Sequence, residues 1–239
     1  MKPGIKVYSS PEEAVKNFSV MIKDLVEKDS NGNFSIALSG GKTAPILFDY
    51  LADKKENINW ENISFYWGDE RCVPPNHPES NYGMAYQHLI KHIKIPKENI
   101  HRIKGEDDPY KEAIRYSQEI KENLKEQNKF PQFDLIILGM GEDGHTASIF
   151  PDQMELLNSN NVCEVAIHPQ SKQKRITLTG RVINNASRIS FLVVGRSKAA
   201  IASEILYEKV NSKRYPAAMI KPANGILEWY LDSEAAMLP

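Results

Sequence analysis

A histidine that could act as a base follows a glycine-rich turn in residues 133–151, FDLIILGMGEDGHTASIFP. Asp143 lies two residues before His145. A neutral imidazole takes up a proton near neutral pH, and a neighbouring carboxylate can fix its orientation and tautomer. We expect the TASIF segment after His145 to be a helix that Pro151 ends, and aspartate is a common helix N-cap. The turn therefore predicts a general base at His145, with Asp143 either as its orienting carboxylate or as a helix cap.

Residues 39–43, SGGKT, have the residue types of a loop that binds a phosphate group. They follow an apolar run at residues 34–38 and precede a helical pattern, so backbone N–H groups and the positive end of the helix would face an anion. The GKT triplet occurs in nucleotide-binding P-loops, but that motif requires glycine where this chain has Ile36. We predict a phosphate loop rather than a plain tight turn, and its candidate residues are Ser39, Gly40, Gly41, Lys42 and Thr43.

Charged residues follow the apolar run at residues 63–67, where we expect a loop. Arg71 offers a planar guanidinium group that can bind a phosphate or a carboxylate through two N–H groups. Asp69 and Glu70 are candidate general bases. The alternative for all three residues is a surface ion pair, which contributes little to stability. We predict that Asp69 and Arg71 belong to the site.

Two further cations lie near apolar segments later in the chain. Arg175 begins the segment RITLT, and Lys198 follows the apolar run at residues 189–194. An ammonium group at the end of a strand suits a phosphate as a point charge, and the alternative is a lysine in solvent at the start of a helix. Arg175 and Lys198 are therefore candidate substrate-binding residues together with Arg71.

These chemical groups need a scaffold that brings distant parts of the chain together. Short apolar runs alternate with amphipathic segments along the whole chain, a pattern typical of parallel strands joined by right-handed crossover helices. Ligands bind at the carboxyl ends of the strands in such sheets. We predict one α/β domain over residues 1–239, with three layers and a mostly parallel sheet. Its loops after Leu38, Trp67, Leu138 and Val194 should gather on one edge.

Composition argues against several other classes of protein. The 239 residues include 30 Lys and Arg and 31 Asp and Glu, and such a charge balance argues against nucleic acid as the main partner. No apolar segment is long enough to cross a bilayer, and the first residues lack the apolar region of a signal peptide. The two cysteines and the histidines at positions 77, 88, 92 and 101 lack metal-ligand spacing, so we predict no metal site. These features fit a cytoplasmic protein.

Several longer motifs occur in order along the chain. They are LSGGKT at residues 38–43, WGDERCVPP at 67–75, SNYGMA at 80–85, LGMGEDGHTASIFP at 138–151 and RITLTGRVINNASRISFLVVG at 175–195. Together they resemble the 6-phosphogluconolactonase family. The resemblance implies a modified Rossmann-like fold and hydrolysis of 6-phosphogluconolactone to 6-phosphogluconate in the oxidative pentose phosphate pathway.

The same resemblance implies roles for particular residues. It maps the catalytic histidine onto His145, the phosphate loop onto residues 39–43, and further anion contacts onto Arg71 and Lys198. It also implies a cytosolic enzyme that needs no cofactor. We expect the partner to be a small phosphorylated sugar lactone, with no nucleic acid and no membrane, and the protein to be a monomer or a weak homo-oligomer.

Two other functions are alternatives. Aldose–ketose isomerases/deaminases of amino-sugar phosphates resemble this family in the sheet, the phosphate loop and the DGH motif, but they carry an extra glutamate shortly after that motif. Here the segment TASIFP contains no acid. A non-catalytic regulator that binds sugar phosphates would usually add a DNA-binding helix-turn-helix unit, for which the chain has no room. A serine-hydrolase mechanism at Ser148 is disfavoured because the residue lacks a nucleophile elbow. We therefore predict activation of water by His145.

Overall fold

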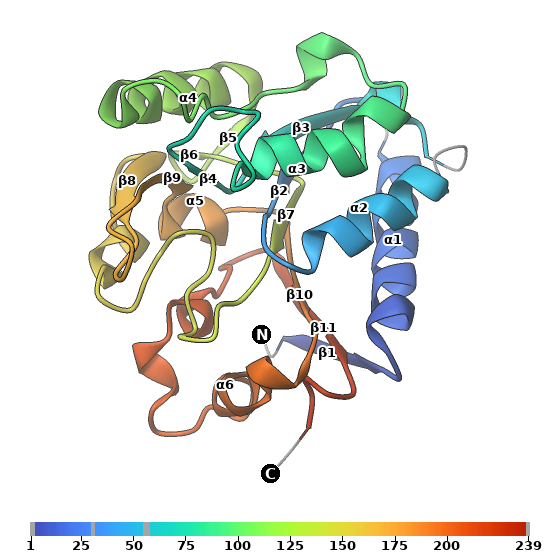
Figure 1. Ribbon diagram of the computed structural model, residues 1–239, viewed down its shortest axis with the longest axis vertical. Coiled ribbons are helices and arrows are strands. Elements are labelled where there is room, and N and C mark those ends of the chain that lie inside the picture. Colours follow the sequence, from blue (N-terminus) through green and yellow to red (C-terminus); the bar gives the residue numbers. More distant parts are fainter. Residues whose placement is uncertain (1–2, 30–31, 55–57, 238–239) are drawn as a thin grey trace.

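A six-stranded parallel sheet forms the centre of the computed structural model, which describes residues 3–29, 32–54 and 58–237 (Figure 1). The strand order is β1-β11-β10-β7-β2-β3, and every neighbouring pair is parallel. The three strands β7, β2 and β3 are buried on both faces, which explains why their sequences are continuous apolar runs. In chain order the strands are β1 (Gly4–Tyr8), β2 (Phe34–Leu38), β3 (Ile63–Trp67), β7 (Leu135–Leu138), β10 (Arg188–Val193) and β11 (Ile226–Asp232).

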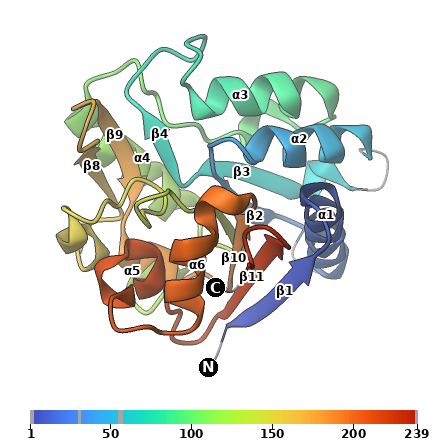
Figure 2. The same cartoon turned by 60° about the horizontal axis from the view of Figure 1, so that its bottom comes forward.

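Helices cover both faces of this sheet and make three layers (Figures 1 and 2). Right-handed crossovers explain the arrangement of the helices other than α3, because the chain moves towards one edge from β2 to β3 and then back from β3 to β7, β10 and β11. The α3 helix follows β3 but packs beside α2. One face carries α1 (Pro11–Lys28), α2 (Ala44–Asp53) and α3 (Asn81–His88), and the other carries α4 (Pro109–Asn123), α5 (Gly180–Asn184) and α6 (Ala199–Leu206). The predicted α/β fold with a mostly parallel sheet is confirmed. In the described part of the chain, no helix has both the length and the apolar character to span a membrane.

Short 3₁₀ helices connect these elements. They are η2 (Trp60–Asn62), η3 (Ile90–His92), η4 (Lys97–Asn99), η5 (Met154–Leu157), η6 (Arg196–Lys198), η7 (Ser212–Arg214) and η8 (Pro216–Met219). A two-stranded hairpin of β5 (Glu126–Gln127) and β6 (Phe130–Pro131) follows α4.

A second sheet, which is antiparallel, lies beside the first (Figure 2). It has the order β4-β9-β8, with β4 at Asp69–Arg71, β8 at Cys163–Ile167 and β9 at Lys174–Leu178. The expectation of a loop after β3 was therefore wrong. Gly68 explains the difference: its N–H donates to Leu38 O in the main sheet (2.8 Å), and its carbonyl accepts from Leu178 N in the second sheet (2.8 Å). The chain thus passes directly from one sheet into the other.

The TASIF segment is not a helix, contrary to the prediction. Thr146 and Ile149 form an isolated antiparallel bridge, in which Ile149 N donates to Thr146 O (2.9 Å) and Thr146 N to Ile149 O (3.4 Å). Between them Ala147 has φ +48°, in the left-handed region. The N–H of Ser148 donates to Thr177 Oγ1 of β9 (3.2 Å), so it does not take part in a helix. Asp143 consequently has no helix to cap.

One buried side chain of α4 closes the carboxyl end of β3. The hydroxyl of Tyr116 accepts a hydrogen bond from Trp67 N (2.8 Å) and donates to Trp67 O (3.1 Å). Tyr116 is fully buried. A hydroxyl group can do both because it has one O–H donor and two lone pairs. This contact holds the end of β3 just before Gly68 and Asp69, where the chain enters the second sheet.

We expect Tyr116→Phe to lower the free energy of unfolding by about 1–3 kcal/mol, because two buried backbone groups of Trp67 lose their partner. Chemical denaturation measures this change. Tyr110→Phe on the same helix is the control, since Tyr110 is 56% exposed and should change stability little. Equal stabilities for the two variants would contradict the role of the Tyr116 hydroxyl.

Candidate active site

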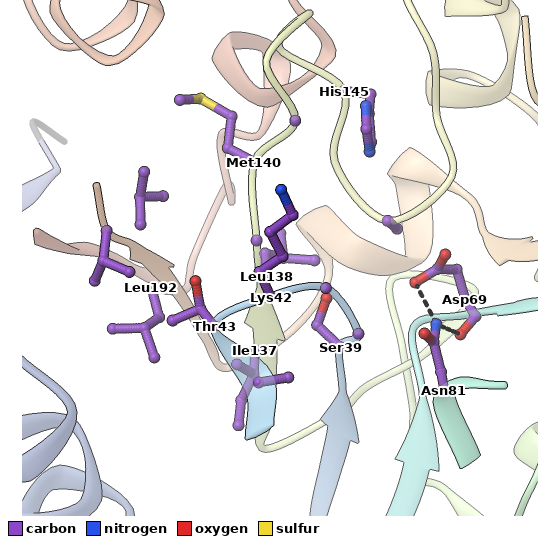
Figure 3. Close-up of a pocket in the computed structure, with 18 of the residues that line it drawn as sticks. Ser39, Lys42, Thr43, Asp69, Asn81, Ile137, Leu138, Met140, His145 and Leu192 are labelled. Carbon is purple, nitrogen blue, oxygen red and sulfur yellow. Dashed lines mark hydrogen bonds between the residues drawn. The ribbon is translucent and has the colours of Figure 1, made fainter. Parts of the chain in front are cut away.

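A cavity of about 500 Å³ lies at the carboxyl ends of the central strands. The chain leaves β2 towards a helix on one face and leaves β7 towards a helix on the other, so a crevice opens between these two neighbouring strands. Residues that follow β2, β3, β7 and β10 all line the cavity, as predicted. Figure 3 shows His145 and Asp69 on one side of it, and Thr43 and Leu192 on the other.

His145 and Asp143 form a directly hydrogen-bonded pair. His145 Nδ1 lies 2.5 Å from Asp143 Oδ1, which also accepts from His145 N (3.0 Å). A carboxylate can only accept, so the proton of a neutral imidazole lies on Nδ1 and Nε2 carries a lone pair. Burial raises the pKa of Asp143, but the hydrogen bonds from the side chain and backbone of His145 and the attraction to its charge together outweigh burial and bring the pKa to about 2. Asp143 is therefore ionised at neutral pH and holds one tautomer of His145.

A glycine makes room for this pair. A Cβ atom at Gly141 would lie 2.1 Å from His145 Nδ1 and 2.6 Å from Asp143 Oδ1. The N–H of Gly141 donates to His145 O (2.9 Å), and Thr146 Oγ1 donates to Gly139 O (2.9 Å). The turn thus closes on itself around the imidazole, and only glycine fits at position 141.

Residues 39–43 lie opposite the His–Asp pair and open onto the N-terminus of α2. The first turn of α2 has no acidic residue, whereas α1 and α4 each have at least one there. The positive end of α2 is therefore not offset by a local carboxylate. Gly41 has φ +92°, and a Cβ at Gly40 would lie 1.9 Å from Asn81 Oδ1, so both positions require glycine. The predicted residues Ser39, Gly40, Gly41, Lys42 and Thr43 all line the cavity.

Two arginines enter the cavity from the second sheet. Arg71 of β4 and Arg175 of β9 are register partners, so two like charges lie opposite each other. The Nε atom of each is buried and has no hydrogen-bond partner in the part of the chain that the structure describes. Burial lowers the pKa of Arg175, and the nearby Asp69 carboxylate opposes that shift. Such a pair is destabilising unless an anion binds to it.

Lys198 approaches the cavity from the segment after β10. Its Nζ lies 3.7 Å from Glu142 Oε1, and its side chain is mostly buried whereas that of Glu142 is 65% exposed. Burial lowers the pKa of Lys198, and the Glu142 carboxylate acts in the opposite direction. Lys198 thus presents a partly desolvated positive charge near the end of the cavity that contains residues 39–43.

Asp69 and Glu70 point to opposite sides of β4, as neighbouring residues of a strand do. Asp69 lines the cavity and accepts a hydrogen bond from Ser148 Oγ at Oδ2 (2.6 Å). Glu70 instead caps α3. Its carboxylate accepts from Asn81 N (2.7 Å), Tyr82 N (2.8 Å), Ser80 Oγ (3.0 Å) and Arg71 N (2.8 Å). Glu70 is therefore a structural cap, and the expectation that it is a candidate base was wrong.

Every predicted site residue except Asp143 lines the cavity, and Asp143 contacts it through His145. Asn81, Glu142 and Ser197 also line it and were not predicted as site residues. Asn81 immediately follows the N-cap Ser80, and the sequence around it indicates only the start of a helix. The hydrogen bond from its Nδ2 to Asp69 O (2.9 Å) depends on the fold. The described residues contain no group of three His, Cys, Asp or Glu side chains that could hold a metal ion.

The fold and the cavity together define an α/β protein with a histidine–aspartate pair, a glycine-rich loop and several cations gathered at the carboxyl edge of its sheet. The chain belongs to the family described as glucosamine-6-phosphate isomerases/6-phosphogluconolactonase, because the family model matches residues 9–229.

Relatives with known names are similar over most of the chain. A 6-phosphogluconolactonase of Haemophilus influenzae is 49% identical over 205 residues, which are 85% of this chain and 86% of that protein. The crystal structure of a protein named devB has a TM-score of 0.92 at 41% identity, with 98% of each chain covered. The structure of 6-phosphogluconolactonase from Trypanosoma brucei has a TM-score of 0.89 at 29% identity, also with 98% of each chain covered.

We expect Gly141→Ala to displace the His145 ring, because the added methyl group would overlap both side chains of the pair. A displacement of about 1 Å at a reacting group can reduce kcat about a hundredfold. Nuclear magnetic resonance of ¹⁵N-histidine-labelled protein should show altered ring signals for His145. Gly139→Ala is the matched control, since a Cβ there meets no atom within 4 Å, and it should leave those signals unchanged.

Proposed function

We propose that the protein hydrolyses 6-phospho-D-glucono-1,5-lactone to 6-phospho-D-gluconate, a step of the oxidative pentose phosphate pathway. The names of its relatives support this reaction. The observation that carries the proposal is the presence, in one cavity, of an imidazole hydrogen-bonded to a carboxylate and a glycine-rich loop at a helix N-terminus. We further propose one lactonase domain over residues 1–239, a cytoplasmic location, and a monomer or weak homo-oligomer.

The first step is the attack of water on the lactone carbonyl. Nε2 of His145 takes a proton from a water molecule, whose oxygen forms a bond to the carbonyl carbon. Asp143 keeps Nδ1 protonated and stabilises the imidazolium that forms. Since the pKa of Asp143 is about 2, this carboxylate keeps its charge across the pH range in which such an enzyme is assayed.

The attack moves an electron pair onto the carbonyl oxygen and creates an oxyanion. The guanidinium groups of Arg71 and Arg175 are fixed cations in the cavity. Such preorganised groups stabilise charge that develops in the transition state. The protonated His145 then donates its proton to the ring oxygen as the C–O bond breaks, which opens the ring.

The phosphate group binds at the opposite end of the cavity. Residues 39–43 supply N–H and hydroxyl donors, and Lys198 and Lys42 supply positive charge. This binding energy positions the carbonyl carbon against His145, which lowers the entropy cost of the reaction. Asp69 remains a predicted member of the site. Its carboxylate offsets the charge of Arg175 and forms the wall beside Asn81.

The region after His145 disfavours the isomerase/deaminase alternative, which needs an additional acid. Phe150 fills the space next to the imidazole, with its ring 4.9 Å from that of His145, and it is fully buried. The guanidinium of Arg175 lies 5.6 Å from the same ring. An aromatic ring at this place cannot transfer a proton between carbons, which favours hydrolysis.

Replacement of His145 by alanine tests the general base. We expect His145→Ala to reduce kcat by about 10²- to 10⁴-fold, with KM within a few-fold of the unmodified protein, because the phosphate contacts remain. The assay follows freshly made lactone and subtracts spontaneous hydrolysis. His92→Ala, which changes a histidine outside the cavity, should keep full activity. A near-normal kcat for His145→Ala would sink the assignment, and no excess rate for the unmodified protein would overturn the proposed function.

Lys198 tests the phosphate site. We expect Lys198→Met to raise KM for the phosphorylated lactone about tenfold to hundredfold, because one charge-assisted contact contributes about 1.5–3 kcal/mol. The same substitution should leave the slow turnover of the unphosphorylated lactone unchanged, which is the internal control. A parallel loss with both substrates would indicate that Lys198 does not bind the phosphate.

A further inference from the structure

The His145 turn is held on the side of the second sheet by one serine. Ser148 lies three residues after His145 and is fully buried. Its Oγ donates to Asp69 Oδ2 on β4 (2.6 Å), and its backbone N–H donates to Thr177 Oγ1 on β9 (3.2 Å). We propose that Ser148 is a positioning residue, which fixes the imidazole of His145 relative to the cations of the second sheet. The inference rests on the proposed function of that site.

The strand register shows where these two contacts lie relative to the arginines of the second sheet. Asp69 and Thr177 are direct partners across β4 and β9, and the partners two residues further along are Arg71 and Arg175. Side chains two residues apart on a strand point to the same face. Ser148 therefore binds the Asp69–Thr177 pair, which lies next to the Arg71–Arg175 pair on the same face of the sheet. A shift of the turn relative to the Asp69–Thr177 pair would change the distance between the imidazole and both guanidinium groups.

Backbone conformation next to Ser148 supports the same role. Ala147 has φ +48°, a left-handed conformation that is strained for a residue with a Cβ atom. Such a conformation persists only when its surroundings determine it. The bridge between Thr146 and Ile149 and the two hydrogen bonds of Ser148 are the contacts that do so.

Ser148 does not have the geometry of a nucleophile. Its hydroxyl hydrogen is committed to Asp69, and the residue is absent from the cavity lining, although its neighbour Ala147 belongs to it. It therefore acts on the reaction only through the turn that carries His145. Removal of the hydroxyl should alter kcat more than KM, because the phosphate loop is untouched.

The test uses Ser148→Ala and a matched control, Ser35→Ala. Ser35 is also buried, and its Oγ also donates to an aspartate, Asp134 Oδ2, at 2.6 Å, but it lies at the amino end of β2, outside the cavity. We expect Ser148→Ala to reduce kcat about tenfold to hundredfold with KM within about threefold. Ser35→Ala should lower stability and leave kcat unchanged. An equal loss of kcat in both variants, or a kcat for Ser148→Ala within twofold of the unmodified protein, would overturn the proposal.

A second readout does not depend on the lactone. The ¹⁵N ring signals of His145, identified by their loss in His145→Ala, should shift in Ser148→Ala and stay in place in Ser35→Ala. If the unmodified protein fails to turn over the lactone, the proposed function fails while this comparison still decides the role of Ser148. If Ser148→Ala does not fold, Thr177→Val removes the acceptor of the Ser148 N–H with little change of shape. Unchanged His145 signals in Thr177→Val would then count against the proposal.

Discussion

The handedness of the crossover connections determines where this molecule can bind a ligand. Crossovers between parallel strands are almost always right-handed, so a reversal in strand order places the helices before and after it on opposite faces of the sheet. That reversal falls between β2 and β7, and the resulting crevice contains both the glycine-rich loop and the His145 turn. Segments about a hundred residues apart in sequence become the two walls of one cavity. Chain topology thus brings the residues of the site together, and the chemistry of each side chain depends on that placement.

A second constraint is the cost of placing several cations in a partly buried space. Arg71 and Arg175 face each other, and their Nε atoms have no hydrogen-bond partner among the residues that the structure describes. Lys198 loses water on burial. Within the described residues, Asp69 and Glu142 supply part of the compensating charge. The remaining excess of positive charge reduces the stability of the free protein, but it favours an anionic ligand. Cations held in place in this way would be preorganised for the anionic substrate proposed above.

The sequence was sufficient for the main sheet and for most of the site because both depend on local patterns. Apolar runs identified β2, β3 and β7, and the residues directly after them formed the cavity. It failed where distant contacts override local preference. TASIF has a helical composition, yet Ser148 N binds Thr177, which is 29 residues away. Ser148 Oγ binds Asp69 across 79 residues, and Asn81 contacts Asp69 across 12. No spacing rule predicts such pairs. The sequence therefore indicated the residues at strand ends, but it did not indicate the contacts of Ser148 and Asn81.

If Lys198 binds the phosphate as proposed above, its contact with Glu142 has a consequence for the end of the reaction. Glu142 is 65% exposed, so it can leave Lys198 and return to water at little cost when a phosphate arrives. The same carboxylate is available to take back the ammonium group when the phosphate leaves. Lys198 therefore exchanges one anion for another and is never stranded without a counter-charge. The product carries a new carboxylate in addition to its phosphate, and competition from Glu142 for Lys198 would weaken the hold on this anion and favour its release.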